Sequence, residues 1–276
     1  MKVKFENSIK NKDEVSKILV FVAIAFLIVF LTARYATDEE FRTLIDVNIL
    51  KKEVTESTLN SIEVDLEANP KIFAYDKHIS IFSKNKLCEY DSNGVKVADL
   101  DINISVPLIH TNGKYAVMAE KDGQNIYLIS GGQIVWKNSV EGNISDVNVN
   151  ENGYVSIIIK NTTYKSVIAF IDPTGLEVFR TYLWANYALC TSISTNNKYL
   201  AIGEVDYSGT ILKSFVKIVS VEKAQSDPKN SMIYTYESDN GEVITDINYQ
   251  DKENATCMFN TYVQKVGIDS NERVYD

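Results

Sequence analysis

The sequence has few residues of the kinds that carry catalytic or metal chemistry. Its 276 residues include two histidines and three cysteines. Cys88, Cys190 and Cys257 cannot all pair within one chain and have no metal-ligand spacing, so neither a disulfide framework nor a zinc site is predicted. Each cysteine lies in an apolar run, which favours core packing over a reactive thiol. His78 and His110 have no acidic or cysteine neighbour at ligand spacing, and we interpret both as surface or core residues.

Basic residues are also scarce relative to acidic ones. The chain has 28 Lys and Arg against 37 Asp and Glu, a formal charge of −9. Binding to a phosphate backbone requires a basic surface, so no nucleic-acid partner is predicted. The sequence contains no Gly-x-Ser-x-Gly elbow, no phosphate-binding loop and no His-Glu-x-x-His motif. It therefore indicates no catalytic residue, no metal ligand and no cofactor, and it favours a protein that is not an enzyme.

The N-terminal part contains one long apolar run. Residues 18–31 are apolar without interruption and are bracketed by Lys17 and Arg34. About sixteen helical residues span roughly 24 Å, and the flanks extend this toward the ~30 Å hydrocarbon core because Lys and Arg side chains can reach the headgroups. A run without a polar face is unlike a helix in a globular core. We predict a transmembrane helix over residues 18–36, with the lipid bilayer as its partner.

The competing interpretation of this run is a cleaved signal peptide, whose apolar region is typically about 7–15 residues long. Leu31–Ala33 and Arg34–Ala36 make poor cleavage motifs, which favours a retained anchor. Residues 1–17 contain five lysines, whereas the 17 residues after position 33 contain two basic side chains. This asymmetry predicts a cytoplasmic tail over residues 1–17 and a single-pass protein of the cell membrane, with its C-terminal domain extracytoplasmic.

A change of pattern follows the apolar run. Thr37 and Glu40 have the spacing of a capping box, and Phe41, Leu44 and Ile45 form a partial apolar face. We therefore predict a short juxtamembrane helix that leads into a polar stalk, together covering residues 37–60.

From residue 61 the composition is that of strands and turns, and two motifs recur. The first, here called the hinge, is an apolar pair, a turn and an apolar strand. Asp begins such turns because its side chain accepts hydrogen bonds from the backbone ahead, and Gly ends them because it adopts positive φ. Hinges occur at Tyr90–Val95, Ile129–Ile134, Ile171–Leu176 and, in degraded form, Ile268–Arg273, with a weaker match at Val219–Lys223.

The second motif is a turn that leads into a buried strand, and its copies are Asn112–Val117, Asn152–Ile157 and Asn197–Ile202. Its tyrosines are 39 and 45 residues apart, while the hinge glycines are 38 and 43 apart. Two motifs that advance together at this period are typical of four-stranded blades in a β-propeller, whereas a β-sandwich has no reason to repeat both in phase. The sequence predicts a mainly β domain over residues 61–276, in which the second motif carries second strands and the hinges join third to fourth strands.

Asp146 and Asp246 occur at matching points of two repeats, where each is expected to begin an innermost strand. Two interpretations follow. The carboxylates ring the mouth of the channel and bind a cation or a basic partner, or each one stabilises a turn in its own blade, which is the favoured interpretation.

An aromatic or small residue stands four places after each hinge glycine, as in Gly132–Trp136, Gly175–Phe179 and Gly94–Ala98. In this pattern the domain resembles the repeats of quinoprotein-like and WD-repeat-like propellers. With its anchor, the chain resembles single-span, propeller-bearing proteins of unknown function in bacterial envelopes. Trp136 alone occupies the tryptophan position of those repeats, and Trp184 lies elsewhere. The resemblance implies the fold without a quinone cofactor, because no acidic base, calcium site or stacking set is identifiable.

These observations predict a non-enzymatic, membrane-tethered interaction module of the cell envelope, whose partner is an envelope protein or polymer. The alternative is a ligand sensor or an enzyme with a pocket on the propeller axis. The 216 residues from Ser61 onward correspond to about five blades. Because little sequence follows the last hinge, either a strand at residues 61–66 completes the ring or, as we favour, the chain is part of a longer propeller with an exposed edge.

Overall fold

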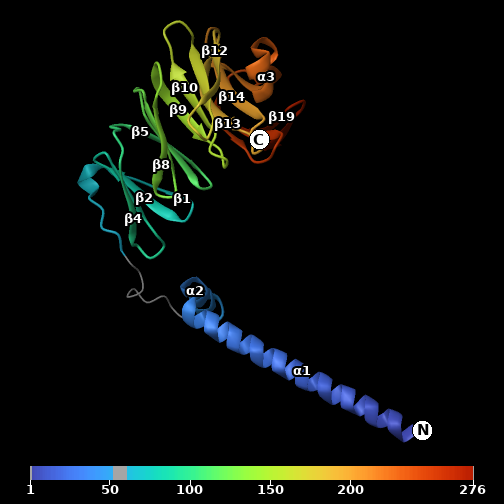
Figure 1. Cartoon of the computed structure of the whole chain (residues 1–276). Coiled ribbons are helices and arrows are strands. Elements are labelled where there is room, and N and C mark those ends of the chain that lie inside the picture. Colours follow the sequence, from blue (N-terminus) through green and yellow to red (C-terminus); the bar gives the residue numbers. More distant parts are fainter. Residues whose placement is uncertain (1, 52–60, 276) are drawn as a thin grey trace. The chain divides into compact units, whose positions relative to one another are not determined.

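The computed structural model describes residues 2–51 and 61–275, which form two compact units that divide after Ser61 (Figure 1). The first unit contains α1 (Lys2–Thr37) and α2 (Glu39–Asn48). Because no glycine or proline interrupts residues 2–37, one helix covers both the segment predicted as a tail and the apolar run. Of the stalk predicted up to residue 60, residues 52–60 lie outside the described part of the chain.

The junction between α1 and α2 differs from the predicted capping box. Asp38 is the N-cap of α2, and its carboxylate accepts a hydrogen bond of 3.0 Å from the backbone N–H of Phe41. Thr37 still belongs to α1, where its hydroxyl donates to the carbonyl of Ala33. The prediction that Thr37 caps the second helix is therefore wrong by one residue, because the adjacent aspartate takes that position.

The second unit contains five four-stranded antiparallel sheets within residues 62–275 (Figure 1). The first blade contains β1 (Lys71–Tyr75), β2 (His78–Ser83), β3 (Lys86–Tyr90) and β4 (Lys96–Asp101). The second contains β5 (Pro107–Asn112), β6 (Tyr115–Glu120), β7 (Asn125–Ser130) and β8 (Gln133–Ser139). The third contains β9 (Asn143–Val149), β10 (Val155–Lys160), β11 (Ser166–Ile171) and β12 (Glu177–Leu183). The fourth contains β13 (Tyr187–Ile193), β14 (Tyr199–Asp206), β15 (Lys213–Ser220) and β16 (Met232–Glu237). The fifth contains β17 (Ile244–Tyr249), β18 (Asn254–Phe259), β19 (Val263–Gly267) and β20 (Asn271–Tyr275).

Every sheet is a meander whose strands follow chain order, and the first strands of consecutive blades contact one another. The predicted propeller architecture with five four-stranded blades is therefore confirmed. The five sheets do not close into a ring. Residues 61–65 form no strand that would complete one, because Asp65 caps the short helix η2 (Leu66–Ala68) and pairs with Lys84 at 2.9 Å.

The hinge turns form as their sequence predicts. The Asp91 carboxylate accepts hydrogen bonds from the backbone N–H groups of Asn93 and Val95, and Gly94 has a φ of 73°. Asp172 makes the equivalent bonds in the third blade. The hinges join third to fourth strands in four blades, so the predicted strand positions of both motifs are confirmed.

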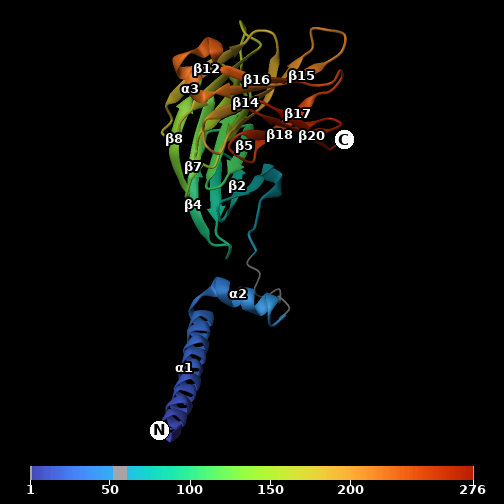
Figure 2. The same ribbon diagram turned by 90° about the vertical axis from the view of Figure 1, so that its right-hand side faces the viewer.

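The fourth blade departs from the hinge pattern. The segment predicted as a weak hinge continues from β15 into the helix α3 (Val221–Ser226), which is followed by η3 (Pro228–Asn230). This segment lacks the Asp and Gly that form the turn, and Ser220 instead caps a helix whose Val221 and Ala224 are buried. As Figure 2 shows, α3 lies against β12 of the preceding blade.

Four hydrophobic clusters hold the blades together, and each lies between two consecutive blades. The residue four places after a hinge glycine contributes to this packing. The Trp136 side chain of the second blade lies against Gly175 of the third, where an added Cβ would stand 2.9 Å from Cγ of the indole. Ala98 of the first blade similarly lies beside Gly132 of the second. The hinge glycine is thus required both for its turn and for the close approach of the preceding blade.

Because the strands alternate in direction, the loops divide between two ends of the propeller. One end carries the hinges and the loops from first to second strands, and we call it the hinge end. The other carries the connections between blades and the loops from second to third strands, and we call it the inter-blade end.

Candidate functional site

A β-bulge recurs in the innermost strands of three consecutive blades. In β9, Ile144 and Asp146 pair with adjacent residues of β10, so Ser145 has no partner in the register. Leu189 in β13 and Thr245 in β17 likewise have no partner on the neighbouring strand. A bulge bends the strand and re-aims the side chains beside it. All three bulges lie near the strand start, at the inter-blade end.

The residues that follow the three bulges are Asp146, Cys190 and Asp246. Asp246 accepts a hydrogen bond of 2.8 Å from the backbone N–H of Ile247, and Asp146 accepts the equivalent bond from Val147. The pKa of Asp146 is raised to about 6. Burial is the main cause, and the negative charge of Asp246 adds a smaller contribution, while the hydrogen bond from Val147 acts in the opposite direction. Burial, followed by the charges of both aspartates, also raises the pKa of the Cys190 thiol. The three side chains therefore share one electrostatic environment.

This geometry corrects the position predicted for the two aspartates. Both lie on innermost strands, but Asp146 is inside β9 (Asn143–Val149) and Asp246 is inside β17 (Ile244–Tyr249), rather than at the first residue. Neither side chain closes a turn, because each one bonds to the next residue of its own strand. The turn interpretation is therefore wrong. The fourth blade, which lies between the third and the fifth, has Cys190 at the matching position. The sequence did not reveal this match, because the residues around Cys190 do not repeat the Asp-x-Asn triplet found at Asp146 and Asp246.

We expect Asp146→Asn to stabilise the protein in a pH-dependent way. Because folding raises the pKa of Asp146 above its ordinary value of 3.8, the stability contributed by this group is present at low pH and is lost as the pH rises through about 6. The variant should match wild type near pH 4 and exceed its free energy of unfolding by about 1–3 kcal/mol above about pH 7. Urea unfolding at a series of pH values measures this difference.

The control for this prediction is Asp246→Asn. Asp246 is exposed, so removing its charge should stabilise less, while lowering the pKa of Asp146. A difference between Asp146→Asn and wild type that does not change with pH would contradict the assignment.

His110 joins the second blade to the third. Its Nδ1 accepts a hydrogen bond of 3.1 Å from the backbone N–H of Val149, and its Nε2 lies 3.1 Å from the side-chain amide of Asn148. Burial lowers the pKa of the imidazole, and the charge of Asp246 opposes this effect. Since Nδ1 accepts a hydrogen bond, the neutral ring carries its proton on Nε2, and this proton can be donated to Asn148 only through the oxygen of its side-chain amide. His110 is a partly buried residue that links the second and third blades through these contacts.

Of the other candidate residues, His78 and Cys88 lie in the first blade, apart from this site. Cys257 is fully buried in the fifth blade and packs in the same hydrophobic cluster as Cys190. Burial, with a further contribution from Asp246, raises the pKa of the Cys257 thiol, so it remains protonated. Within residues 2–51 and 61–275, no group of three or more His, Cys, Asp or Glu side chains is placed to hold a metal ion.

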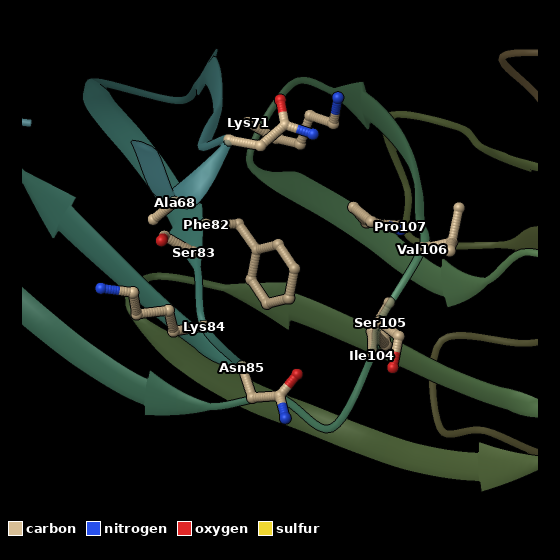
Figure 3. A pocket seen from close by; sticks show the side chains of 11 residues that line it. Ala68, Lys71, Phe82, Ser83, Lys84, Asn85, Ile104, Ser105, Val106 and Pro107 are labelled. Atoms are coloured by element: carbon tan, nitrogen blue, oxygen red, sulfur yellow. The ribbon is translucent and has the colours of Figure 1, made fainter. Parts of the chain in front are cut away.

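A hollow of about 270 Å³ lies between the first and second blades, at the inter-blade end (Figure 3). The Phe82 ring stands in its middle, and the amino group of Lys84 points away from it. Carboxylate, imidazole and thiol groups are absent from its lining, which includes Lys71, Ile104 and Pro107. The bulge aspartates do not line this hollow, so it is separate from the candidate site.

Comparison with known proteins places the chain in a family. The model of a family of unknown function, DUF5711, matches residues 50–267. The chain belongs to the DUF5711 family. In this DUF5711 protein the match covers the propeller as far as β19 and leaves out the apolar helix. No curated protein sequence matches it.

Solved structures share the fold of this DUF5711 protein at low sequence identity. Hsv2p of Kluyveromyces lactis has a TM-score of 0.52 at 11% identity, covering 75% of this chain and 69% of its own. The β-propeller domain of Cps50 (Swd1) from Myceliophteria thermophila has a TM-score of 0.52 at 10% identity, covering 73% and 69%. Hydrazine synthase of Kuenenia stuttgartiensis has a TM-score of 0.53 at 11% identity, covering 81% and 70%. These likenesses show a propeller fold in the DUF5711 protein.

Proposed function

We propose that this DUF5711 protein is a membrane-tethered interaction module, in which α1 anchors the chain and the propeller presents a binding surface outside the cytoplasmic membrane. The observation that carries the proposal is a fully exposed apolar helix in the same chain as a propeller. Leu19–Thr37 has a mean hydropathy of 2.3, and Phe21 and Phe26 are 74% and 75% exposed. Such a helix is long and apolar enough to cross a bilayer, by its length and composition.

Exposed apolar surface on this scale favours burial, since transfer from water contributes about 25 cal/mol per Å². A bilayer supplies that burial for every side of the helix at once. The lysines of residues 1–17 support a cytoplasmic N-terminus. On this basis the propeller lies outside the membrane and meets envelope proteins or polymers.

Propellers bind through loops and strand ends held on a rigid scaffold. Here the inter-blade end presents bulged innermost strands and the half-buried carboxylate of Asp146, whose raised pKa reflects a location that disfavours its charge. A charge retained where it weakens the fold is typical of binding sites. We therefore take the inter-blade end as the binding surface.

The anchor is tested with the full-length protein in its own membranes. We expect it to stay in the membrane pellet after extraction with alkaline carbonate, and to keep an intact mass that includes residues 1–36. Protease added to spheroplasts should digest the propeller. Release into the supernatant, or a mass that lacks the N-terminal segment as for a cleaved signal peptide, would overturn the tether. Full protection from the protease would overturn the orientation.

A matched variant sharpens this test. Leu27→Arg places a charge in the middle of the apolar helix, and a central Arg opposes insertion by about 2.5–3.5 kcal/mol. We expect a smaller carbonate-resistant fraction from this variant, whereas Leu66→Arg, at an exposed position of the propeller unit, should leave the fraction unchanged.

A further inference from the structure

Five aromatic side chains gather at the inter-blade end of the third and fourth blades, and we call them the aromatic patch. Tyr164 lies between β10 and β11, Tyr182 is near the end of β12, Trp184 follows it, Tyr187 begins β13, and Tyr207 follows β14. Segments more than 40 residues apart in the sequence thus bring their rings to one surface. No motif in the sequence groups these residues.

Ring contacts order the patch as two groups, which meet at Lys165, the residue after Tyr164. The centroid of the Tyr164 ring is 4.4 Å from that of Trp184 and 4.7 Å from that of Tyr182. The rings of Tyr187 and Tyr207 stack at 4.8 Å. Aromatic pairs at these separations attract each other beyond the effect of burial alone. The rings are therefore ordered before any partner arrives, which reduces the entropy lost on binding.

The patch is open to solvent although its residues are of the kinds that usually pack inside. Trp184 is 67% exposed, Tyr207 is 50% exposed and Tyr182 is 47% exposed, whereas Trp136 is 8% exposed. Tryptophan and tyrosine dominate the binding energy of protein interfaces when a partner covers them. Exposed aromatic side chains gathered in this way are typical of an interaction site.

One cation of the chain already lies over two rings of the patch. The ammonium group of Lys165 lies 5.0 Å from the ring centroid of Tyr187 and 5.7 Å from that of Tyr207. A cation over an aromatic face is attracted by the negative charge density of the ring. The exposed rings of Tyr182 and Trp184 offer the same kind of face to a cation from outside.

The charge of the unit favours the same partner. Residues 62–276 contain 28 Asp and Glu against 19 Lys and Arg. Asp146 and Asp246 add their carboxylates at the same end of the propeller. A negative field attracts basic segments and repels anionic polymers.

We propose that the aromatic patch binds a segment of a partner protein rich in lysine and arginine, whose cationic side chains stack on Trp184 and Tyr182. This names the partner class of the interaction module and rests on the function proposed above. Arginine suits such a surface because its guanidinium group stacks on rings while its remaining donors reach carboxylates.

Fluorescence anisotropy tests the proposal with full-length protein in detergent micelles. The probe is a labelled peptide of four alternating Arg-Lys pairs. We expect the double variant Trp184→Ala, Tyr182→Ala to bind it at least about tenfold more weakly than wild type. The matched control is Tyr275→Ala, which removes an aromatic side chain that is 70% exposed on β20 and should leave the affinity unchanged. The peptide should also protect Trp184 from quenching by acrylamide.

Three outcomes would overturn the proposal. The first is equal affinity of the double variant and wild type, which would mean that charge alone attracts the peptide. The second is binding of a neutral oligosaccharide, such as a tetramer of N-acetylglucosamine, in place of the peptide. The third is no binding of the peptide by wild type. Because this experiment uses micelles, it does not depend on the membrane anchor. If the carbonate extraction fails but the peptide binds, only the tether is wrong. If the protein stays in the membrane but the peptide does not bind, only the partner class is wrong.

Discussion

Replacing Lys217 with methionine is expected to lower the free energy of unfolding by about 3–5 kcal/mol. The Lys217 ammonium group lies 2.6 Å from Oε2 of Glu204, a residue with no exposed surface. The side-chain amide of Asn186 donates to the same oxygen at 3.0 Å, and Oε1 has no hydrogen-bond partner. Without the lysine, this buried carboxyl group loses its cationic partner and keeps one neutral donor, the amide of Asn186. Urea unfolding of the full chain in micelles, followed by tryptophan fluorescence, measures the loss.

The double variant Glu204→Leu, Lys217→Met is the control, because it removes both charges and keeps apolar volume. Replacing a buried ion pair with packed apolar residues is often neutral or stabilising, so this variant should recover most of the loss. If the double variant is as unstable as Lys217→Met, the lysine acts through packing of its chain and the electrostatic explanation is wrong.

Replacing Tyr75 with phenylalanine is expected to destabilise the protein by about 1.5–3 kcal/mol. The Tyr75 hydroxyl donates to Oε1 of Glu89, which is fully buried and whose Oε2 has no partner. Burial, and then the hydrogen bond to Glu89, raise the pKa of the Tyr75 phenol, so it remains a donor at every physiological pH. The variant removes this donor and changes little else. The midpoint of unfolding in urea measures the effect.

Ser80→Ala is the matched control for this prediction. Ser80 pairs directly with Glu89 across β2 and β3, and its buried hydroxyl has no partner. Its removal should be neutral or slightly stabilising, because an unpaired buried hydroxyl contributes no hydrogen bond. A loss from Ser80→Ala as large as that from Tyr75→Phe would show that Glu89 depends on the serine instead.

The parts of this fold that were predictable from the sequence are those determined by local chemistry. Asp91 and Gly94, like Asp172 and Gly175, form their hinge turns through bonds within a few residues, so their spacing also revealed the blade period. The hinge predicted after β15 does not form, because burial of Val221 against the neighbouring blade stabilises a helix there.

The site was less predictable because its parts meet through register and contacts between blades. A bulge such as that at Ser145 leaves no signature in one strand, since it depends on the pairing with β10. The aromatic patch joins two blades, since Lys165 of the third blade lies over the ring of Tyr187 in the fourth. The matched Asp-x-Asn triplets at Asp146 and Asp246 were the one local signal of the site, and they located its strands correctly.

The open series of blades has a consequence for how the domain unfolds. In a closed ring every blade has two neighbours, whereas here the second, third and fourth blades are packed on both faces, and the first and fifth on one. Stability in such an array is a sum of terms between nearest neighbours, as in a solenoid, so opening starts at the ends and moves inward. The third blade, which carries Asp146 and half of the aromatic patch, is the furthest from either fraying end. Amide hydrogens should therefore exchange last where the binding surface is built.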